Sequence, residues 1–189
     1  TSPFALCNSV TERFGGGLLP MPSTEVAIRD DQGATLACGE VGEICIRGPQ
    51  VMRGYWQRPA ETAQVLSPEG WLRTGDLGSM DAQGRVQITD RKKDLVLVSG
   101  FNVYPNEVEA VLAQHAGVVE SAVVGVPDDR TGEALRAFVV RRDDNLSEAV
   151  LIAHCRTRLT AYKVPRQVVF VAQLPKSAVG KILRRALRT

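Results

Sequence analysis

The basic segment near the end of the chain holds the side chains best suited to chemistry on an anion. Lys176, Lys181, Arg184, Arg185 and Arg188 follow one another without an acid between them. A helix expected over about 181–187 places Lys181 at a helix N-terminus, where the dipole disfavours a cation. Like charges three and four positions further on add a repulsion of roughly 0.2–0.5 kcal/mol each. An anionic ligand would explain this pattern, and a solvated basic face is the alternative.

A second candidate is Asp76 in the tripeptide Thr74-Gly75-Asp76. We expect a loop here, in which the glycine lets a short carboxylate side chain accept two hydrogen bonds from a vicinal diol such as a ribose. An aspartate in a turn also bonds its own backbone, and the tripeptide alone favours that interpretation.

A third candidate is the charged cluster 90–94, which reads Asp-Arg-Lys-Lys-Asp. Charges at this density are not buried unless they are paired, so we expect a surface connector or a cleft between two bodies. The apolar run 95–98 predicts a strand covered on both faces, Ser99-Gly100 predicts a turn, and Pro105 suits the first position of a helix. A new domain is therefore expected to begin here, although a solvated turn between two strands would also fit.

Composition sets broad limits on the function. The chain has 189 residues, 44% hydrophobic and 23% charged, which suits one or two globular domains. A net charge of +2 gives little reason to expect a nucleic-acid partner. Four cysteines without a CxxC pair (Cys7, Cys38, Cys45 and Cys155) predict reduced, buried thiols in a cytosolic protein. The two histidines are too far apart to predict a metal site, and no stretch is long and apolar enough to predict a membrane span.

Hydrophobic patterning divides the chain into two parts. Strands expected at 24–29, 42–47 and 86–89, the last with Val86 and Ile88 facing inward, make residues 1–90 a small β-rich unit. Helices at 105–115 and 148–159 alternate with strands at 118–126, 134–141 and 168–171. The predicted fold class is therefore α+β, with the β-rich unit followed by a compact α+β domain, residues 91–189, around a central three-stranded sheet.

Taken together, three segments resemble the adenylate-forming enzymes, which include acyl-CoA synthetases, luciferases and the adenylation domains of peptide synthetases. They are the hinge-like stretch 90–109, the Gly-Trp-x-x-Thr-Gly-Asp stretch 70–76, and the Pro-Lys-Ser-x-x-Gly-Lys-Ile-x-Arg stretch 175–184. The resemblance runs from about Val26 to the end. From Asp90 onward it is most similar to bacterial long-chain fatty acid CoA ligases.

The resemblance implies a role for each candidate residue. Lys181 corresponds to the catalytic lysine of adenylation, and Asp76 and Arg91 to residues that hold the ribose of the nucleotide. Lys93 corresponds to the hinge between two domain orientations. The turn Ser99-Gly100-Phe101 corresponds to a wall of the pantetheine tunnel used in thioester formation.

The resemblance further implies a ligase that converts a fatty acid, ATP and CoA to acyl-CoA, AMP and pyrophosphate through an acyl-adenylate, with Mg²⁺ held by an N-terminal part. The chain starts at Thr1-Ser2-Pro3 without a methionine, which suggests a fragment. It lacks the Thr-Ser-Gly-Thr-Thr-Gly phosphate loop, the Tyr-Gly-x-Thr-Glu segment and an acyl pocket. We therefore expect no acyl-adenylate formation by this chain alone.

Alternatives remain open at this stage. An aryl or short-chain acyl-CoA ligase, or an adenylation domain serving a carrier protein, would share these motifs. A non-catalytic module could instead use the basic segment on nucleic acid or an anionic membrane. The expected partners are the small-molecule substrates and the N-terminal domain of a cytoplasmic parent, with peripheral association at the inner membrane face or a homodimer as further options.

Overall fold

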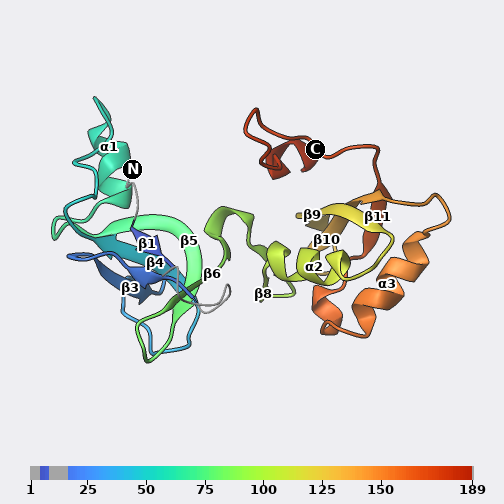
Figure 1. Cartoon of the computed structure of the whole chain (residues 1–189), viewed down its shortest axis with the longest axis horizontal. Coiled ribbons are helices and arrows are strands. Elements are labelled where there is room, and N and C mark those ends of the chain that lie inside the picture. Colours follow the sequence, from blue (N-terminus) through green and yellow to red (C-terminus); the bar gives the residue numbers. More distant parts are fainter. Residues whose placement is uncertain (1–4, 9–16, 189) are drawn as a thin grey trace. The chain divides into compact units, whose positions relative to one another are not determined.

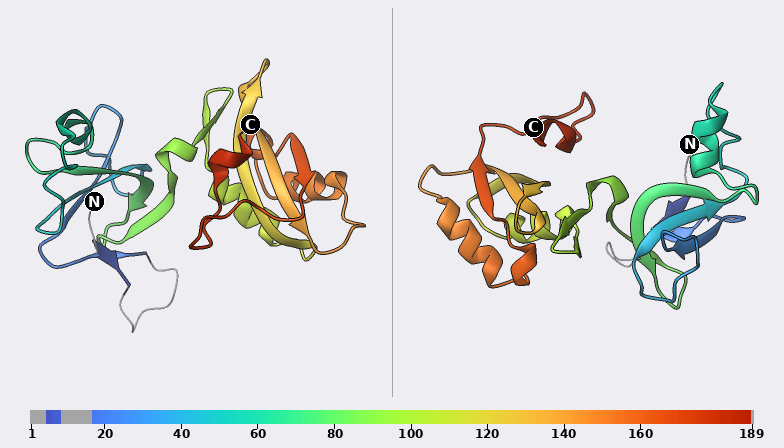
Figure 2. Two further views of the ribbon diagram at one scale, coloured as in Figure 1. Left: turned by 90° about the horizontal axis from the view of Figure 1, so that it is seen from above. Right: turned by 180° about the vertical axis from the view of Figure 1, so that it is seen from behind.

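The computed structural model describes residues 5–8 and 17–188, and the chain forms two compact units, Thr1–Lys93 and Asp94–Thr189. The starting Thr1-Ser2-Pro3 segment lies outside the described residues. Each unit has its own sheet and its own hydrophobic core, as Figure 1 and the two further views in Figure 2 show. The division falls inside the charged cluster 90–94, three residues after the boundary expected from sequence.

The first unit is built on a four-stranded antiparallel sheet in the order β3-β4-β5-β6. Its strands are β3 (Glu25–Arg29), β4 (Gly42–Arg47), β5 (Leu72–Met80) and β6 (Val86–Arg91). A separate hairpin pairs β1 (Leu6–Cys7) with β2 (Leu19–Pro20). The three strands expected from alternation are confirmed, and all the pairings in the four-stranded sheet are antiparallel.

Sequence patterning missed the β1–β2 hairpin, strand β5 and helix α1 (Pro59–Val65) in this unit. Glycines at positions 75 and 78 weaken the strand signal of β5, because glycine in a strand usually marks a bulge or a close approach of two backbones. Helix α1 buries none of its residues, so it lacks the apolar stripe by which helices are recognised.

The core of the first unit consists of Ile28, Ile44, Ile46, Leu72 and Val86. The expectation that Ile88 also faces inward is wrong, since 54% of its surface is exposed whereas Val86 is fully buried. Residues two apart share a face of a strand, but that face is open at Ile88, which lines a pocket described below.

The second unit is built on a five-stranded sheet. Its strands are β7 (Val96–Val98), β8 (Phe101–Val103), β9 (Val118–Asp128), β10 (Gly132–Arg141) and β11 (Gln167–Phe170). Strand β10 is central, with β9 antiparallel to it, β11 parallel to it and β7 joined at the Gly132–Val98 pair. The three expected strands pair with one another through β10, and the β7–β8 hairpin adds two more.

The β7–β8 hairpin turns through Ser99 and Gly100, whose φ angles are 51° and 82°. Two successive positive φ angles define a type I′ turn, the tight turn that matches the twist of a hairpin. In β7, Val96 and Val98 are buried while Leu97 is 48% exposed. The expectation of a strand covered on both faces is therefore wrong, because the face of β7 that carries Leu97 is open.

Helices α2 (Pro105–Ala113) and α3 (Glu148–Arg156) pack with the sheet in one hydrophobic cluster. Leu112 of α2 and Leu151 of α3 are buried in this cluster, together with Val123 of β9. The neighbouring residues Ala122 and Val124 point to the opposite face, because side chains alternate along a strand. There they contact Leu174 and Leu187 of the C-terminal segment, which thus covers the second face of the sheet.

The C-terminal segment differs from the expected helix over 181–187. Only Arg184–Leu187 is helical, as the short 3₁₀ helix η3, and Lys181 lies before it in a hairpin. Lys181 is therefore not at a helix N-terminus.

The four cysteines are free thiols. Cys45 and Cys155 are buried as expected, whereas Cys38 is exposed, against expectation.

Gly78 on β5 gives a test of the first unit's packing. A Cβ built there would lie 2.2 Å from the carbonyl oxygen of Gln87 and 2.8 Å from Cδ1 of Ile44. We expect Gly78→Ala to lower the free energy of unfolding of this unit by about 1–3 kcal/mol, the usual cost of overpacking. Both tryptophans of the chain, Trp56 and Trp71, belong to this unit, so urea unfolding followed by their fluorescence reports on it.

Ser79→Ala, one position further along β5, is the matched control and should change the free energy by less than about 0.5 kcal/mol. Equal stability of the Gly78→Ala variant and the wild type would contradict the close approach of β5 and β6 at this point.

Candidate functional site

The Thr74-Gly75-Asp76 tripeptide lies in a bulge of strand β5 and not in the loop expected from sequence. Across β4, Arg73 pairs with Cys45 and Leu77 with Glu43, so three residues of β5 stand opposite Ile44 alone. Gly75 has a φ of +74°, a conformation that side chains rarely adopt. The bulge redirects the strand and aims its side chains outward, as bulges at functional sites commonly do.

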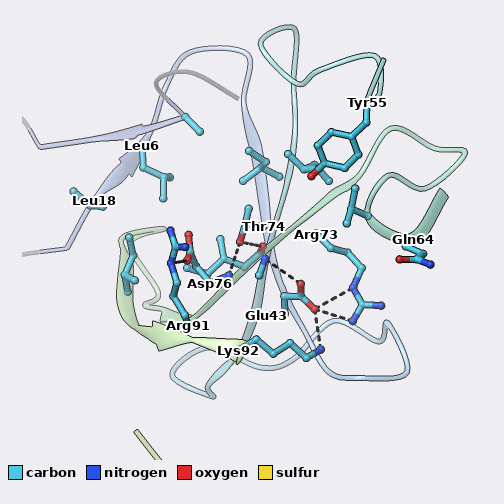
Figure 3. A pocket seen from close by; sticks show the side chains of 17 residues that line it. Leu6, Leu18, Glu43, Tyr55, Gln64, Arg73, Thr74, Asp76, Arg91 and Lys92 are labelled. Atoms are coloured by element: carbon cyan, nitrogen blue, oxygen red, sulfur yellow. Dashed lines mark hydrogen bonds and ion pairs between the residues drawn. The ribbon is translucent and has the colours of Figure 1, made fainter. Parts of the chain in front are cut away.

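The side chain of Thr74 holds the bulge in shape. Its hydroxyl donates to the Ile44 carbonyl at 2.7 Å and accepts from the Asp76 amide at 3.1 Å. The Asp76 carboxylate then lies 3.2 Å from Nε of Arg91, the residue paired with it across β6 (Figure 3). Both side chains are partly exposed, at 33% and 46%. The structure thus brings together the two residues predicted to hold a ribose.

Beneath the bulge lies Glu43, a buried acid that sequence reasoning did not single out. Its carboxylate accepts from the Gly75 amide at 3.2 Å, from Nη2 of Arg73 at 2.7 Å and from Nζ of Lys92 at 3.0 Å (Figure 3). Burial acts to raise the pKa of Glu43, but the hydrogen bonds and charges of Arg73 and Lys92 outweigh it and hold that pKa below its usual value. The sequence signal that could have identified Glu43 is its position as the one acid in the otherwise largely apolar strand 42–47.

A pocket of about 650 Å³ opens beside this network. Its apolar wall includes Leu6, Leu18, Ile44, Leu72 and Ile88, and its polar wall includes Thr74, Asp76 and Arg91. Figure 3 shows Asp76 and Arg91 side by side within this lining. An apolar wall with a few convergent polar groups is the usual make-up of a small-molecule site.

The predicted hinge residue Lys93 lies in the 3₁₀ turn η1 (Lys92–Asp94) and is exposed. Its neighbours are tied to different units. Lys92 pairs with Glu43 and with Asp31 of the first unit, whereas Asp94 pairs with arginines of the second. Lys93 thus lies between two anchored residues. It is the middle residue of η1 and not at an element end, where a pivot was expected.

Lys181 lies in a hairpin closed by the pair Lys176–Ile182. The Ser177 amide donates to the Lys181 carbonyl at 2.8 Å, and the Lys181 amide donates to the Ser177 hydroxyl at 3.2 Å. Gly180 makes the turn with a φ of +79°. The Lys181 side chain is exposed, and its ammonium group forms no ion pair with residues 5–8 or 17–188.

The turn Ser99-Gly100-Phe101 presents an aromatic surface. Phe101 is 55% exposed and stacks on Tyr162, with ring centroids 4.7 Å apart. The Ser99 amide donates to the Thr131 carbonyl at 2.8 Å, which fixes the turn to the start of β10. A fixed turn with an exposed ring suits contact with an extended, largely apolar ligand arm.

The part of the chain that the structure describes contains no cluster of three or more metal-binding side chains. Within that same part, no helix has the length and apolar character needed to cross a bilayer.

Sequence comparison decides the family. Residues 1–56 match the model of the AMP-binding enzymes, and residues 107–181 match the model of the AMP-binding enzyme C-terminal domain. The chain belongs to the AMP-binding enzymes.

A long-chain-fatty-acid–CoA ligase of Yersinia pestis is 59% identical over 178 residues, which is 94% of this chain and 32% of that protein. The corresponding ligase of Bacillus subtilis is 50% identical over 170 residues. The chain thus spans about a third of the length of the relatives it matches.

Solved structures of AMP-binding enzymes share the fold. ATP-bound MatB from Rhodopseudomonas palustris is 39% identical, with a TM-score of 0.86 over 90% of this chain and 34% of that one. The o-succinylbenzoate CoA synthetase of Bacillus subtilis, solved with its acyl-adenylate, is 37% identical, with a TM-score of 0.83 over 90% of this chain and 34% of that one. Enzymes named for different acids therefore share this region.

The lowered pKa of Glu43 makes a prediction about pH. A carboxylate whose pKa is depressed on folding stabilises the folded state at pH values above its pKa in the unfolded state, which is 4.5 for Glu43. This stabilisation is lost as the pH falls through the pKa of the folded state. We expect Glu43→Gln to lower the free energy of unfolding of the first unit by about 1–3 kcal/mol at pH 7, because Arg73 and Lys92 lose their charged acceptor.

The difference between the wild type and Glu43→Gln should shrink as the pH is lowered below 4.5, as measured by urea unfolding with tryptophan fluorescence. Glu61→Gln, which removes an exposed ion pair with Arg58, is the control and should behave as the wild type. A pH-independent difference would contradict the role of the Glu43 charge.

Proposed function

We propose that this chain is the C-terminal part of an ATP-dependent long-chain fatty acid–CoA ligase. The parent would convert a fatty acid, ATP and CoA to acyl-CoA, AMP and pyrophosphate through an acyl-adenylate. Residues up to about 90 would close the N-terminal AMP-binding domain, and residues 91–189 would form the mobile domain. Without the rest of the parent the chain would lack the phosphate loop and the acyl pocket, and would form no acyl-adenylate.

The observation that carries the proposal is the unequal pairing of cations in the C-terminal segment. Lys176, Arg184 and Arg188 each have an acidic partner within their own unit, namely Glu120, Glu109 and Asp94. Lys181 and Arg185 have none among the described residues, and of these two only Lys181 stands on the exposed hairpin. Internal pairing leaves little free charge for the rival function, a module that binds nucleic acid or an anionic membrane through a broad basic face.

In the first half-reaction, a carboxylate oxygen of the fatty acid attacks the α-phosphorus of ATP and pyrophosphate leaves. Two anions meet, so negative charge accumulates in the transition state and a positioned ammonium group stabilises it. Lys181 would supply that group, touching both the carboxylate and the nucleotide. Asp76 would accept hydrogen bonds from the ribose hydroxyls, and Arg91 would contact the same sugar while orienting Asp76.

In the second half-reaction, the thiolate of CoA attacks the acyl carbonyl and AMP leaves. Rotation about Lys93 would withdraw Lys181 and bring the Ser99-Gly100-Phe101 turn to the nucleotide. The exposed Phe101 ring and the fixed Ser99 backbone would then line the tunnel for pantetheine. Rotation of a rigid domain about a few residues in a connecting turn is a known route between two catalytic arrangements.

The long-chain acyl specificity proposed for the parent rests on the names of the similar ligases. Aryl and short-chain acyl-CoA ligases and adenylation domains that serve a carrier protein would use the same C-terminal chemistry. Mg²⁺ would be bound by the N-terminal part. Peripheral association of the parent at the inner face of the membrane and a homodimer stay open predictions, which vesicle sedimentation and light scattering of the full-length ligase would test.

Lys181→Ala in the full-length ligase tests the assigned chemistry. We expect pyrophosphate exchange to fall by about 10²–10³-fold, the usual cost of removing one group that stabilises developing charge. Thioester formation from preformed acyl-adenylate should stay within about twofold of the wild type. Arg185→Ala, four positions further on and also exposed, should leave both rates unchanged. Wild-type exchange in Lys181→Ala would remove the residue from the mechanism.

Asp76→Ala tests nucleotide binding separately. Loss of a charged acceptor to the ribose should raise the KM for ATP by about 10–100-fold, since such a hydrogen bond contributes roughly 1.5–3 kcal/mol. Asp81→Ala, at the residue that directly follows β5, is the control and should leave the KM for ATP unchanged. An unaltered KM for ATP in the Asp76→Ala enzyme would be incompatible with the ribose assignment.

A further inference from the structure

The hairpin that carries Lys181 is held in place at few points. Of its residues, Ile182 packs partly into the cluster formed by Leu174, Leu187 and strand β9. Val179 at the tip is 90% exposed. The hairpin is also tied to Glu120 of β9 through Lys176, but both side chains of that ion pair are more than a third exposed, and such pairs contribute little. A second firm point is therefore needed to set the direction of the lysine side chain.

Arg184 provides that second point, two residues after Ile182. Its Nε lies 3.1 Å from Oε1 of Glu109 and its Nη2 lies 2.7 Å from Oε2, which makes a bidentate pair. Nη2 also donates to Oδ1 of Asn106 at 2.6 Å, and Nη1 lies 3.5 Å from Oδ2 of Asp94. The guanidinium group is planar with donors in a fixed fork, so this arrangement fixes direction as well as distance.

The acids in this contact are largely buried. The side chains of Asp94 and Glu109 are 11% and 17% exposed, and that of Arg184 is 19% exposed. Arg188 completes the group by donating to Oδ1 of Asp94 at 2.9 Å. Two carboxylates at this depth need compensating cations, so the contact is costly to break.

Asp94 is the first residue of the second unit and directly follows Lys93. Glu109 lies on α2, and the Glu109 carboxylate also accepts from the Val123 amide of β9 at 2.8 Å. The Arg184 contact therefore connects the Lys181 hairpin with the domain's first residue, its first helix and its central sheet.

We propose that Arg184 is the positioning residue of Lys181. By clamping the hairpin to Glu109 and Asp94, Arg184 makes the lysine move as one rigid body with the residue next to the pivot, so that rotation at Lys93 delivers the ammonium group to a fixed position. This inference rests on the proposed function. Misplacement of a catalytic group by about 1 Å can cost around 10²-fold in rate, so a clamp that touches no substrate can still control adenylation.

The test uses Arg184→Gln and Arg184→Lys in the full-length ligase. We expect Arg184→Gln to lower the rate of pyrophosphate exchange by about 10–100-fold. The rate of thioester formation from preformed acyl-adenylate should stay within about twofold, because that step does not use the hairpin. Arg184→Lys keeps the charge but loses the fork, so it should recover only part of the exchange rate.

Arg185→Gln is the matched control and should behave as the wild type. Hydrogen exchange gives an independent readout, in which the peptide covering residues 175–183 should exchange faster in Arg184→Gln, while β9 stays protected. Glu109→Gln keeps Arg184 but removes its charged partner, and it should lower pyrophosphate exchange in the same selective way.

Several outcomes would overturn the inference. Wild-type exchange in Arg184→Gln, in an enzyme where Lys181→Ala abolishes exchange, would show that the clamp is not needed. An equal loss of both half-reactions in proportion to the folded fraction would show a merely structural role. Wild-type exchange in Lys181→Ala would instead show that the proposed function fails at its first step.

Discussion

A buried carboxylate has to be neutralised by nearby cations, and each unit of this chain meets that requirement with the segment that carries its functional side chain. In the first unit, Glu43 is compensated by Arg73 and Lys92, which flank the Asp76 bulge and the Arg91 strand end. In the second unit, Glu109 is compensated by Arg184, three residues after Lys181. Burial makes both pairings costly to break. The backbone beside them is therefore fixed, and with it the positions from which Asp76 and Lys181 project.

Pairing of buried acids also explains why the joint between the units is a single residue. Lys92 is held by an acid of the first unit, and Asp94 is held by arginines of the second. One exposed residue remains between them. A connector built in this way can change its backbone angles at one position without disturbing either core, which is what alternation between two catalytic arrangements needs.

Sequence reasoning recovered the parts of the fold that have strong periodicity and failed where tertiary contacts override it. The strands 42–47 and 86–89 and the helix that begins at 148 were predictable from alternation and from helical periodicity. Strand β5 was missed because its glycines serve a bulge and a close backbone approach. The final helix was misplaced because basic residues were read as a helical face, whereas Arg184 and Arg188 pair with acids about 75 to 94 residues earlier. Such long-range pairs leave no local signal.

The central claim is that Lys181 meets the nucleotide in one arrangement and leaves it in the other. Differential amine labelling of the full-length ligase tests this directly, with Lys176, which pairs with Glu120, as the internal reference. We expect ATP to protect Lys181 from labelling, and a non-hydrolysable acyl-adenylate analogue together with CoA to expose it again. Equal labelling of Lys181 in the free, ATP-bound and CoA-bound states would contradict this claim.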